Sequence, residues 1–156
     1  MMAERERNMV NAADPADPES GEQTGTGPAD SYVAIDLETT GIGAKREKIT
    51  EIGMVKVENG AVTDTYHTLV NPGRPIPEHI TELTGIDDDM VKDAPMIQDV
   101  IGEVIAFCGT LPVLGHQIMF DYGFLVQAAV NGKLRFERSG IDTLKPVSYT
   151  HLTLPT

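Results

Sequence analysis

Asp36 and Glu38, two carboxylates two positions apart, are the residues of this chain whose type and spacing best suit chemistry. They lie in the stretch 32–38, where apolar side chains at positions 33, 35 and 37 alternate with them, as in a strand with one buried face. Same-face neighbours on a strand lie roughly 7 Å apart, so the two acids repel each other unless a cation or proton lies between them. Mg²⁺ and Mn²⁺ prefer oxygen ligands, and two ions about 3.5 to 4 Å apart can catalyse a phosphoryl displacement. The alternative is a solvent-facing strand with two surface acids.

Small residues follow this strand directly. Thr39, Thr40 and Gly41 combine two hydroxyl groups with a permissive backbone that allows a nucleotide to approach closely. We therefore predict that these three residues bind substrate.

A third carboxylate, Asp121, lies in a stretch predicted to turn from a buried strand into a helix that ends near residues 131–132. Phe120, Phe124 and Leu125 give this helix a core face. Asp121 is one helical step, about 100°, from Phe120, so it can lie where the buried face meets an open cleft. The alternative is an ordinary surface aspartate.

The other elements must bring these acids together. Residues 49–58 and 61–70 read as strands joined at Asn59-Gly60, a strong hairpin signal. A short helix over about 77–84 should end at Gly85, and the acids at 87–89 are predicted to cap the next helix rather than to bind metal. A core helix follows within 93–108, and the strand at 112–116 should join the sheet in parallel.

The loop after the first strand carries Lys45, Arg46 and Lys48, the densest basic cluster in the chain. These side chains either meet a phosphate backbone or are simply solvated.

Two ordered motifs resemble the DEDD exonuclease superfamily, DEDDh type, in the branch of bacterial polymerase-associated proofreading domains. Residues 36–41 read Asp-Leu-Glu-Thr-Thr-Gly, like the first motif of that family. Residues 116–121 read His-Gln-Ile-Met-Phe-Asp, like the second, with Gln117 where the family usually has Asn. The resemblance extends from about Ser31 to Lys145.

The resemblance implies a ribonuclease H-like α/β fold with a mixed sheet of about five strands, the first three antiparallel and the later ones parallel, flanked by helices. It also implies that Asp36, Glu38 and Asp121 are catalytic and hold two Mg²⁺ or Mn²⁺ ions. The expected activity is 3′–5′ exonuclease hydrolysis of nucleic acid, DNA favoured, that releases nucleoside monophosphates. A DNA polymerase is an expected partner.

The family's third motif, a helical His followed five residues later by Asp, has no counterpart. Residues 146–156 contain no carboxylate, so His151 lacks the Asp that should follow it. We therefore interpret 31–145 as a partial exonuclease domain, incomplete at its C-terminus, and 146–156 as a tail foreign to the family. General base catalysis is typically worth about 10² to 10⁴ in rate, so low activity is expected of these 156 residues.

Composition narrows the class of protein. A chain of 156 residues suits one domain, and its net charge of −12 argues against a broad basic surface for nucleic acid. Residues 1–30 are predicted to be a disordered acidic leader, because they hold 7 acidic residues against 2 basic ones and almost no large apolar residue. A single cysteine and no long apolar stretch indicate a cytoplasmic protein with no membrane partner.

Two other functions stay open. An RNA exonuclease can use the same carboxylates, because they do not recognise the 2′-hydroxyl. A noncatalytic module for nucleic acid or a protein partner would keep the fold without the chemistry, although it has no need of three converging acids.

Overall fold

A computed structural model describes residues 30–144 and 149–151 of the chain. Residues 1–29 of the predicted acidic leader and most of the predicted tail lie outside these residues. The helices are α1 (Glu78–Thr84), α2 (Asp88–Val91), α3 (Ile97–Cys108) and α4 (Ile118–Asn131). The strands are β1 (Tyr32–Thr39), β2 (Ile49–Glu58), β3 (Ala61–Leu69), β4 (Val113–Gly115), β5 (Ser139–Asp142) and β6 (Tyr149–His151).

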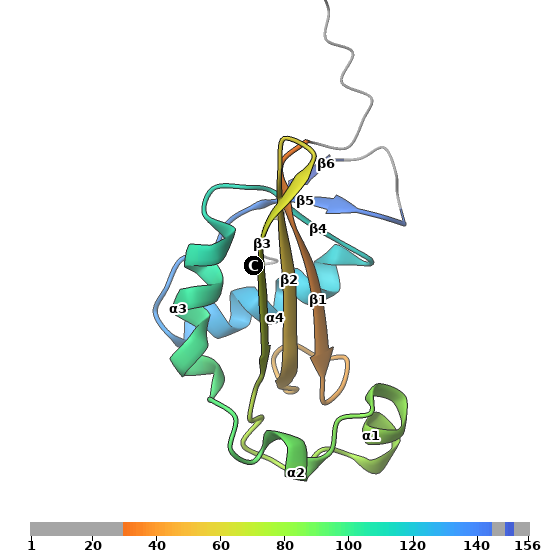
Figure 1. The fold of residues 1–156 in the computed structure, drawn as a ribbon. Coiled ribbons are helices and arrows are strands. Elements are labelled where there is room, and N and C mark those ends of the chain that lie inside the picture. The colour runs from red at the N-terminus through yellow and green to blue at the C-terminus, as the bar shows by residue number, and fades with distance from the viewer. Residues whose placement is uncertain (1–29, 145–148, 152–156) are drawn as a thin grey trace, which may run out of the picture.

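The strands form one mixed sheet in the order β3-β2-β1-β4-β5-β6 (Figure 1). β2 runs antiparallel to both of its neighbours, β1 and β3, whereas β4 runs parallel to β1 and β5 parallel to β4. The expected ribonuclease H-like arrangement of five strands is therefore confirmed. The sixth strand, β6, adds to the edge of the sheet antiparallel to β5.

Local chemistry explains where several elements turn. Asn59 and Gly60 both have positive φ, at 52° and 79°, which is the backbone of the tight turn that suits the twist of a hairpin. Helix α1 ends at Gly85, whose φ of 77° is left-handed, and the Gly85 N–H donates to the Thr81 carbonyl. Asp87 caps α2, because its side chain accepts a hydrogen bond from the Met90 N–H. The prediction that this acidic run caps a helix is confirmed at that residue.

One face of the sheet carries the main core. Strand residues Val33, Ile35 and Ile52 pack there with helix residues such as Val104 and Leu125, all of them at most 4% exposed. α3 and α4 supply the helical side of this core, and Figure 1 shows both helices on the same side of the strands. The opposite face of β1 and β2 therefore remains open, with no described helix packed over it.

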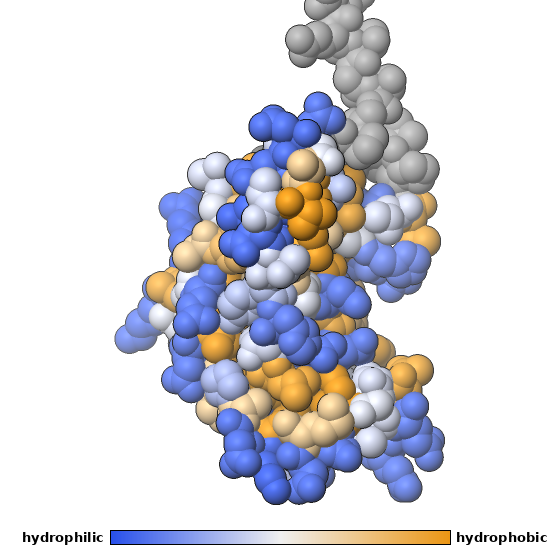
Figure 2. All heavy atoms as spheres, in the orientation of Figure 1, coloured by the Kyte–Doolittle hydropathy of each residue, from blue (hydrophilic) through white to orange (hydrophobic). Residues whose placement is uncertain are grey.

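The segment with α1 and α2 lies beyond the end of the sheet where β1 finishes (Figure 1). It has a small apolar cluster of its own, formed by Ile76, Ile86 and Val91. Figure 2 shows apolar groups gathered in the lower part of this view, framed by hydrophilic residues. Within the described residues no helix is both long and apolar enough to cross a bilayer.

Candidate nuclease site

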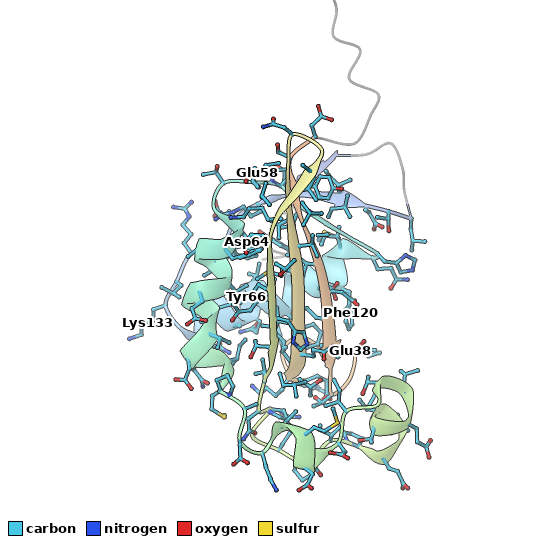
Figure 3. All side chains as sticks on the ribbon, viewed as in Figure 1. Glu38, Glu58, Asp64, Tyr66, Phe120 and Lys133 are labelled. Carbon is cyan, nitrogen blue, oxygen red and sulfur yellow. The ribbon has the colours of Figure 1, made fainter. Side chains whose placement is uncertain are left out.

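Two carboxylates project from β1 onto the open face of the sheet. The burial of β1 alternates as predicted, with Ile35 and Leu37 buried, Asp36 exposed and Glu38 half-buried. A β-bulge shifts the pairing with β2 between Glu38 and Thr39, and bulges of this kind re-aim side chains at the end of a strand. Figure 3 shows Glu38 near the lower end of β1. Both acids therefore lie close to the loop that follows the strand.

Asp121 reaches the same end of the sheet from the first turn of α4. β4 lies beside β1 and its last residue, Gly115, leads into α4, so the parallel pairing carries the helix start to β1. A Cβ built on Gly115 would lie 3.0 Å from the Ile35 carbonyl oxygen and 3.8 Å from Asp121 Oδ2. The absence of a side chain at Gly115 thus leaves room for the Asp121 carboxylate against β1. Asp121 is only 5% exposed.

The charges on β1 raise the pKa of neighbouring acids. The pKa of Asp121 is raised to about 7, first by burial and then by the charges of Asp36 and Glu38, while a hydrogen bond from the Leu37 amide opposes the shift. Burial also raises the pKa of Glu38, and nearby Asp36 is the next largest cause. The predicted convergence of one strand and one later helix is therefore present in the fold.

The acids do not form a preassembled metal cage. Among residues 30–144 and 149–151, no group of three or more His, Cys, Asp or Glu side chains is arranged to hold a metal ion. Uncompensated carboxylates repel one another. A cation between them would weaken that repulsion and would lower the pKa of Asp121. Carboxylate oxygens are suitable ligands for a hard divalent ion, although in the described residues they are not arranged to coordinate one.

The predicted substrate-binding residues build the loop after β1. The Thr39 hydroxyl donates to the Gly41 carbonyl at 2.7 Å, and the Thr40 hydroxyl donates to Glu47 Oε2 at 2.6 Å. Thr40 is also 2% exposed, so its hydroxyl serves the loop rather than a free surface. A Cβ at Gly41 would lie 2.9 Å from Glu47 Cδ. Binding of substrate by these three residues stays a prediction.

Sequence reasoning did not identify Glu51 as part of this site. Glu51 on β2 is the direct register partner of Glu38, and its charge contributes to the raised pKa of Glu38. His67 on β3 holds Glu51 in turn, with Nε2 3.2 Å from Oε2. The hairpin at residues 59–60 fixes only the register of β2 with β3, which brings His67 near Glu51. The pairing of Glu51 with Glu38 depends on the register of β2 with β1, for which no short stretch of sequence gives a signal. Glu51 extends the acidic row across the open face.

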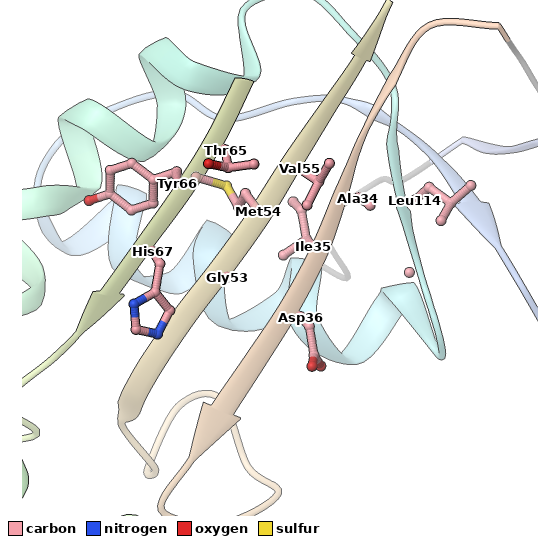
Figure 4. A pocket seen from close by; sticks show the side chains of 11 residues that line it. Ala34, Ile35, Asp36, Gly53, Met54, Val55, Thr65, Tyr66, His67 and Leu114 are labelled. Atoms are coloured by element: carbon pink, nitrogen blue, oxygen red, sulfur yellow. The ribbon is translucent and has the colours of Figure 1, made fainter. Parts of the chain in front are cut away.

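The open face is hollowed beside this row. A cavity of about 410 Å³ is lined by Asp36 and His67 together with Ala34, Val55 and Leu114, and it opens to solvent. Figure 4 shows Asp36 and His67 toward one end of the hollow, with the apolar side chains above them. Of the acids of this site, Asp36 therefore borders a concave and mainly apolar surface, whereas Glu38 and Asp121 lie outside its lining.

The junction between β4 and α4 is held by Asp142. Its Oδ1 accepts hydrogen bonds from the Gln117 N–H at 3.2 Å and from the Leu144 N–H at 2.9 Å. Gln117 has a φ of 52°, a left-handed backbone that Asn adopts more readily than Gln. This backbone gives a physical reason to expect that Asn would be favoured over Gln at position 117. His116 is exposed beside it.

Comparison with known proteins places the chain in the nuclease class. A family model described as Exonuclease (RNase T) matches residues 33–154, and this range contains all three acids. The chain belongs to this exonuclease family.

Relatives with similar sequences are named DNA polymerase III PolC-type. The one from Caldanaerobacter subterraneus subsp. tengcongensis is 41% identical over 114 residues, which cover 73% of this chain and 8% of the relative. The one from Bacillus subtilis is 40% identical over 119 residues, which cover 74% of this chain and 8% of the relative. The predicted resemblance to polymerase-associated exonucleases is confirmed, and the chain spans only a small part of the length of these relatives.

Solved structures of exonuclease I share the fold. The apo form gives a TM-score of 0.65 at 14% identity and covers 75% of this chain and 30% of that one. The Escherichia coli enzyme in complex with a dA16 oligonucleotide gives the same TM-score and identity, with coverages of 74% and 28%. At this identity the likeness concerns the fold alone.

Proposed function

We propose that this chain is a nuclease domain that removes nucleotides from the 3′ end of a nucleic acid strand, with DNA as the preferred substrate. The observation that carries the proposal is that the start of α4 approaches β1 at Gly115 and brings Asp121 to the end of the strand that bears Asp36 and Glu38. The charges of Asp36 and Glu38 there raise the pKa of Asp121. Two other supports are membership of the exonuclease family and relatives named as DNA polymerases. By the same argument we propose a DNA polymerase as partner and the cytoplasm as location.

The three carboxylates would hold Mg²⁺ or Mn²⁺, with Asp36 and Glu38 contributing from the strand and Asp121 from the helix. Two such ions, when bound, lower the pKa of an attacking water and stabilise the leaving oxygen. Asp121, whose pKa is raised to about 7, must give up its proton to become a ligand. Cation binding should therefore release a proton and should tighten as the pH rises through neutrality.

The proposal is tested by a readout that does not require turnover. Mn²⁺ should raise the melting temperature of the unaltered chain, because an ion bound only to the native state adds about 2.7 kcal/mol at 100 times its Kd. Asp36→Asn should abolish this Mn²⁺-induced increase. The quantity to compare is the increase and not the melting temperature itself, since Asp36→Asn also removes a repulsion.

Asp64→Asn is the matched control, because Asp64 is exposed on β3 and outside the hollow. It should retain the full Mn²⁺ response. Equal responses in Asp36→Asn and in the unaltered chain would contradict the proposal, and so would the absence of any Mn²⁺ response.

Matched DNA and RNA oligonucleotides labelled at the 5′ end then test substrate and direction. A ladder that shortens from the 3′ end only when Mn²⁺ is present supports the proposed reaction, and faster shortening of DNA supports the preferred substrate. Faster shortening of RNA would assign the RNA alternative. Oligonucleotide binding that does not depend on Mn²⁺, without shortening, would favour the noncatalytic module.

A further inference from the structure

The loop between β1 and β2 concentrates positive charge that is not neutralised within the described residues. Lys45, Arg46 and Lys48 are three of the 12 lysines and arginines of the chain, which also holds 24 acidic residues. Within residues 30–144, none of these three cationic head groups takes part in an ion pair, although Lys92, Arg74 and Arg135 do. In so acidic a chain, cations that stay unpaired are available for an external anion.

The backbone of this loop is braced from several sides. The Thr40 N–H donates to the Lys48 carbonyl at 2.8 Å, and the Lys48 N–H donates to the Thr40 hydroxyl at 2.9 Å. Glu47, the acid within the basic run, accepts from the Thr40 hydroxyl and lies 3.7 Å from Arg74 Nη1. Arg74 also donates from Nη2 to the Arg46 carbonyl. The internal acid is thus occupied, and Arg74 fixes the loop from a distant part of the chain.

This bracing leaves Lys45 and Arg46 exposed on a preorganised loop. Preorganisation lowers the conformational entropy lost on binding, so such a loop is better suited to hold an anion than a mobile one. Lys48 is partly buried and lines a small recess beside Phe124 and Gln127 on the helical side. Of the three cationic side chains, Lys45 and Arg46 are therefore the two that are exposed to solvent.

The position of the loop indicates which anion it meets. It begins two residues after Glu38, at the same end of β1 as the coupled carboxylates (Figures 1 and 3). When the terminal phosphodiester of a strand lies at the carboxylates, the adjoining phosphates of that strand must lie against the protein surface nearby. Carboxylates without bound cations repel that strand, so nearby cations are needed to hold it.

We propose that Lys45 and Arg46 bind phosphate groups of the nucleic acid backbone. These phosphates belong to the strand that is cleaved and adjoin the phosphodiester at the carboxylates. This proposal rests on the proposed function and adds the contact that positions the strand. Contacts of this kind fix register without reading sequence. Binding should therefore be tolerant of sequence and sensitive to salt.

The test is the salt dependence of binding between the full 156-residue chain and a fluorescent single-stranded DNA in EDTA, where no cleavage occurs. Each lost phosphate contact on a single strand reduces the slope of log K against log salt by about 0.7. The double variant Lys45→Gln/Arg46→Gln should therefore lose about 1.4 from the slope. It should also bind more weakly at low salt, by about tenfold or more.

Lys133→Gln/Arg135→Gln is the matched control, because it removes the same two charges from exposed positions after α4. It should keep the slope of the unaltered chain, and thermal melting should show that both double variants fold. If the slope fell equally in the two variants, the effect would depend only on net charge, and the proposal would be overturned. No loss in Lys45→Gln/Arg46→Gln, or no measurable binding by the unaltered chain, would overturn it too.

The Mn²⁺ response separates this failure from failure of the proposed function. A chain that Mn²⁺ stabilises through Asp36, but whose salt slope does not depend on Lys45 and Arg46, keeps its nuclease assignment and loses only the phosphate contact. Poly-glutamate that displaces the DNA at equal charge concentration would show that the loop binds polyanions in general, and would also overturn the assignment to nucleic acid.

Discussion

Glu38 on β1 and Glu51 on β2 are directly opposite each other in the antiparallel pair, so two negative charges meet across one step of the sheet. Like charges at opposed strand positions destabilise a sheet by roughly 0.2 to 1 kcal/mol. His67 on β3, the strand on the other side of β2, contacts Glu51. His67 and Asp36 both line the hollow on the open face. Repulsion between Glu38 and Glu51 therefore lowers the stability of the sheet next to Asp36.

Glu51→Gln should lower the pKa of Glu38, because the Glu51 charge is one of the causes that raise it. It should also increase the free energy of unfolding at pH 7 by a few tenths of a kcal/mol. Side-chain carboxyl NMR titration measures the first effect and urea unfolding the second. Glu82→Gln, an exposed change on α1, should do neither. An unchanged Glu38 pKa in Glu51→Gln would show that the two carboxylates do not interact.

The raised pKa of Asp121 makes stability depend on pH. In the unfolded chain Asp121 ionises near 3.8, whereas in the fold it keeps its proton up to about pH 7. Between these values the unfolded state binds fewer protons, so the free energy of unfolding should fall as the pH rises from about 4 to 7. A shift of this size corresponds to a loss on the order of 4 kcal/mol.

Asp121→Asn should remove this slope, because asparagine has no charge to bury and can still accept the hydrogen bond from the Leu37 amide. The variant should be more stable than the unaltered chain at pH 8 and should lose the Mn²⁺ response. Urea unfolding at pH 5 and pH 8 measures the slope, with Asp64→Asn as the control at an exposed position. The same pH dependence in all three proteins would refute the burial of an ionisable group at position 121.

Gly115→Ala should destabilise the fold by about 1 to 3 kcal/mol, because the new methyl group would lie 3.0 Å from both the Ile35 carbonyl oxygen and Ile118 Cδ1. It should also weaken the Mn²⁺ response by pushing the start of α4, and with it Asp121, away from β1. Gly102→Ala provides a matched control, since nothing lies within 4 Å of a Cβ there. In the interior of α3 it should add roughly 0.5 to 1 kcal/mol of stability. Equal effects of the two changes would contradict the close approach at Gly115.

Much of the local structure was predictable because its causes are local. The alternation along β1 fixed the face of Asp36 and Glu38, and the Asn59-Gly60 turn fixed the hairpin. The helix end at Gly85 followed from the left-handed backbone that glycine adopts. The roles of Glu47 and Glu51 were not visible in this way, because neither stands in a recognisable motif.

The sequence by itself determined which residue types are available and which side of its own element each of them occupies, since both depend on neighbours a few positions away. Only the tertiary structure decided that Asp121 meets Asp36 and Glu38, because this needs β4 to lie parallel beside β1 with Gly115 at the contact. It likewise decided that Glu51 is opposite Glu38 and that Arg74 braces the basic loop. Strand pairing and side-chain contacts between distant segments are set by the packing of the whole sheet, which no short stretch of sequence encodes.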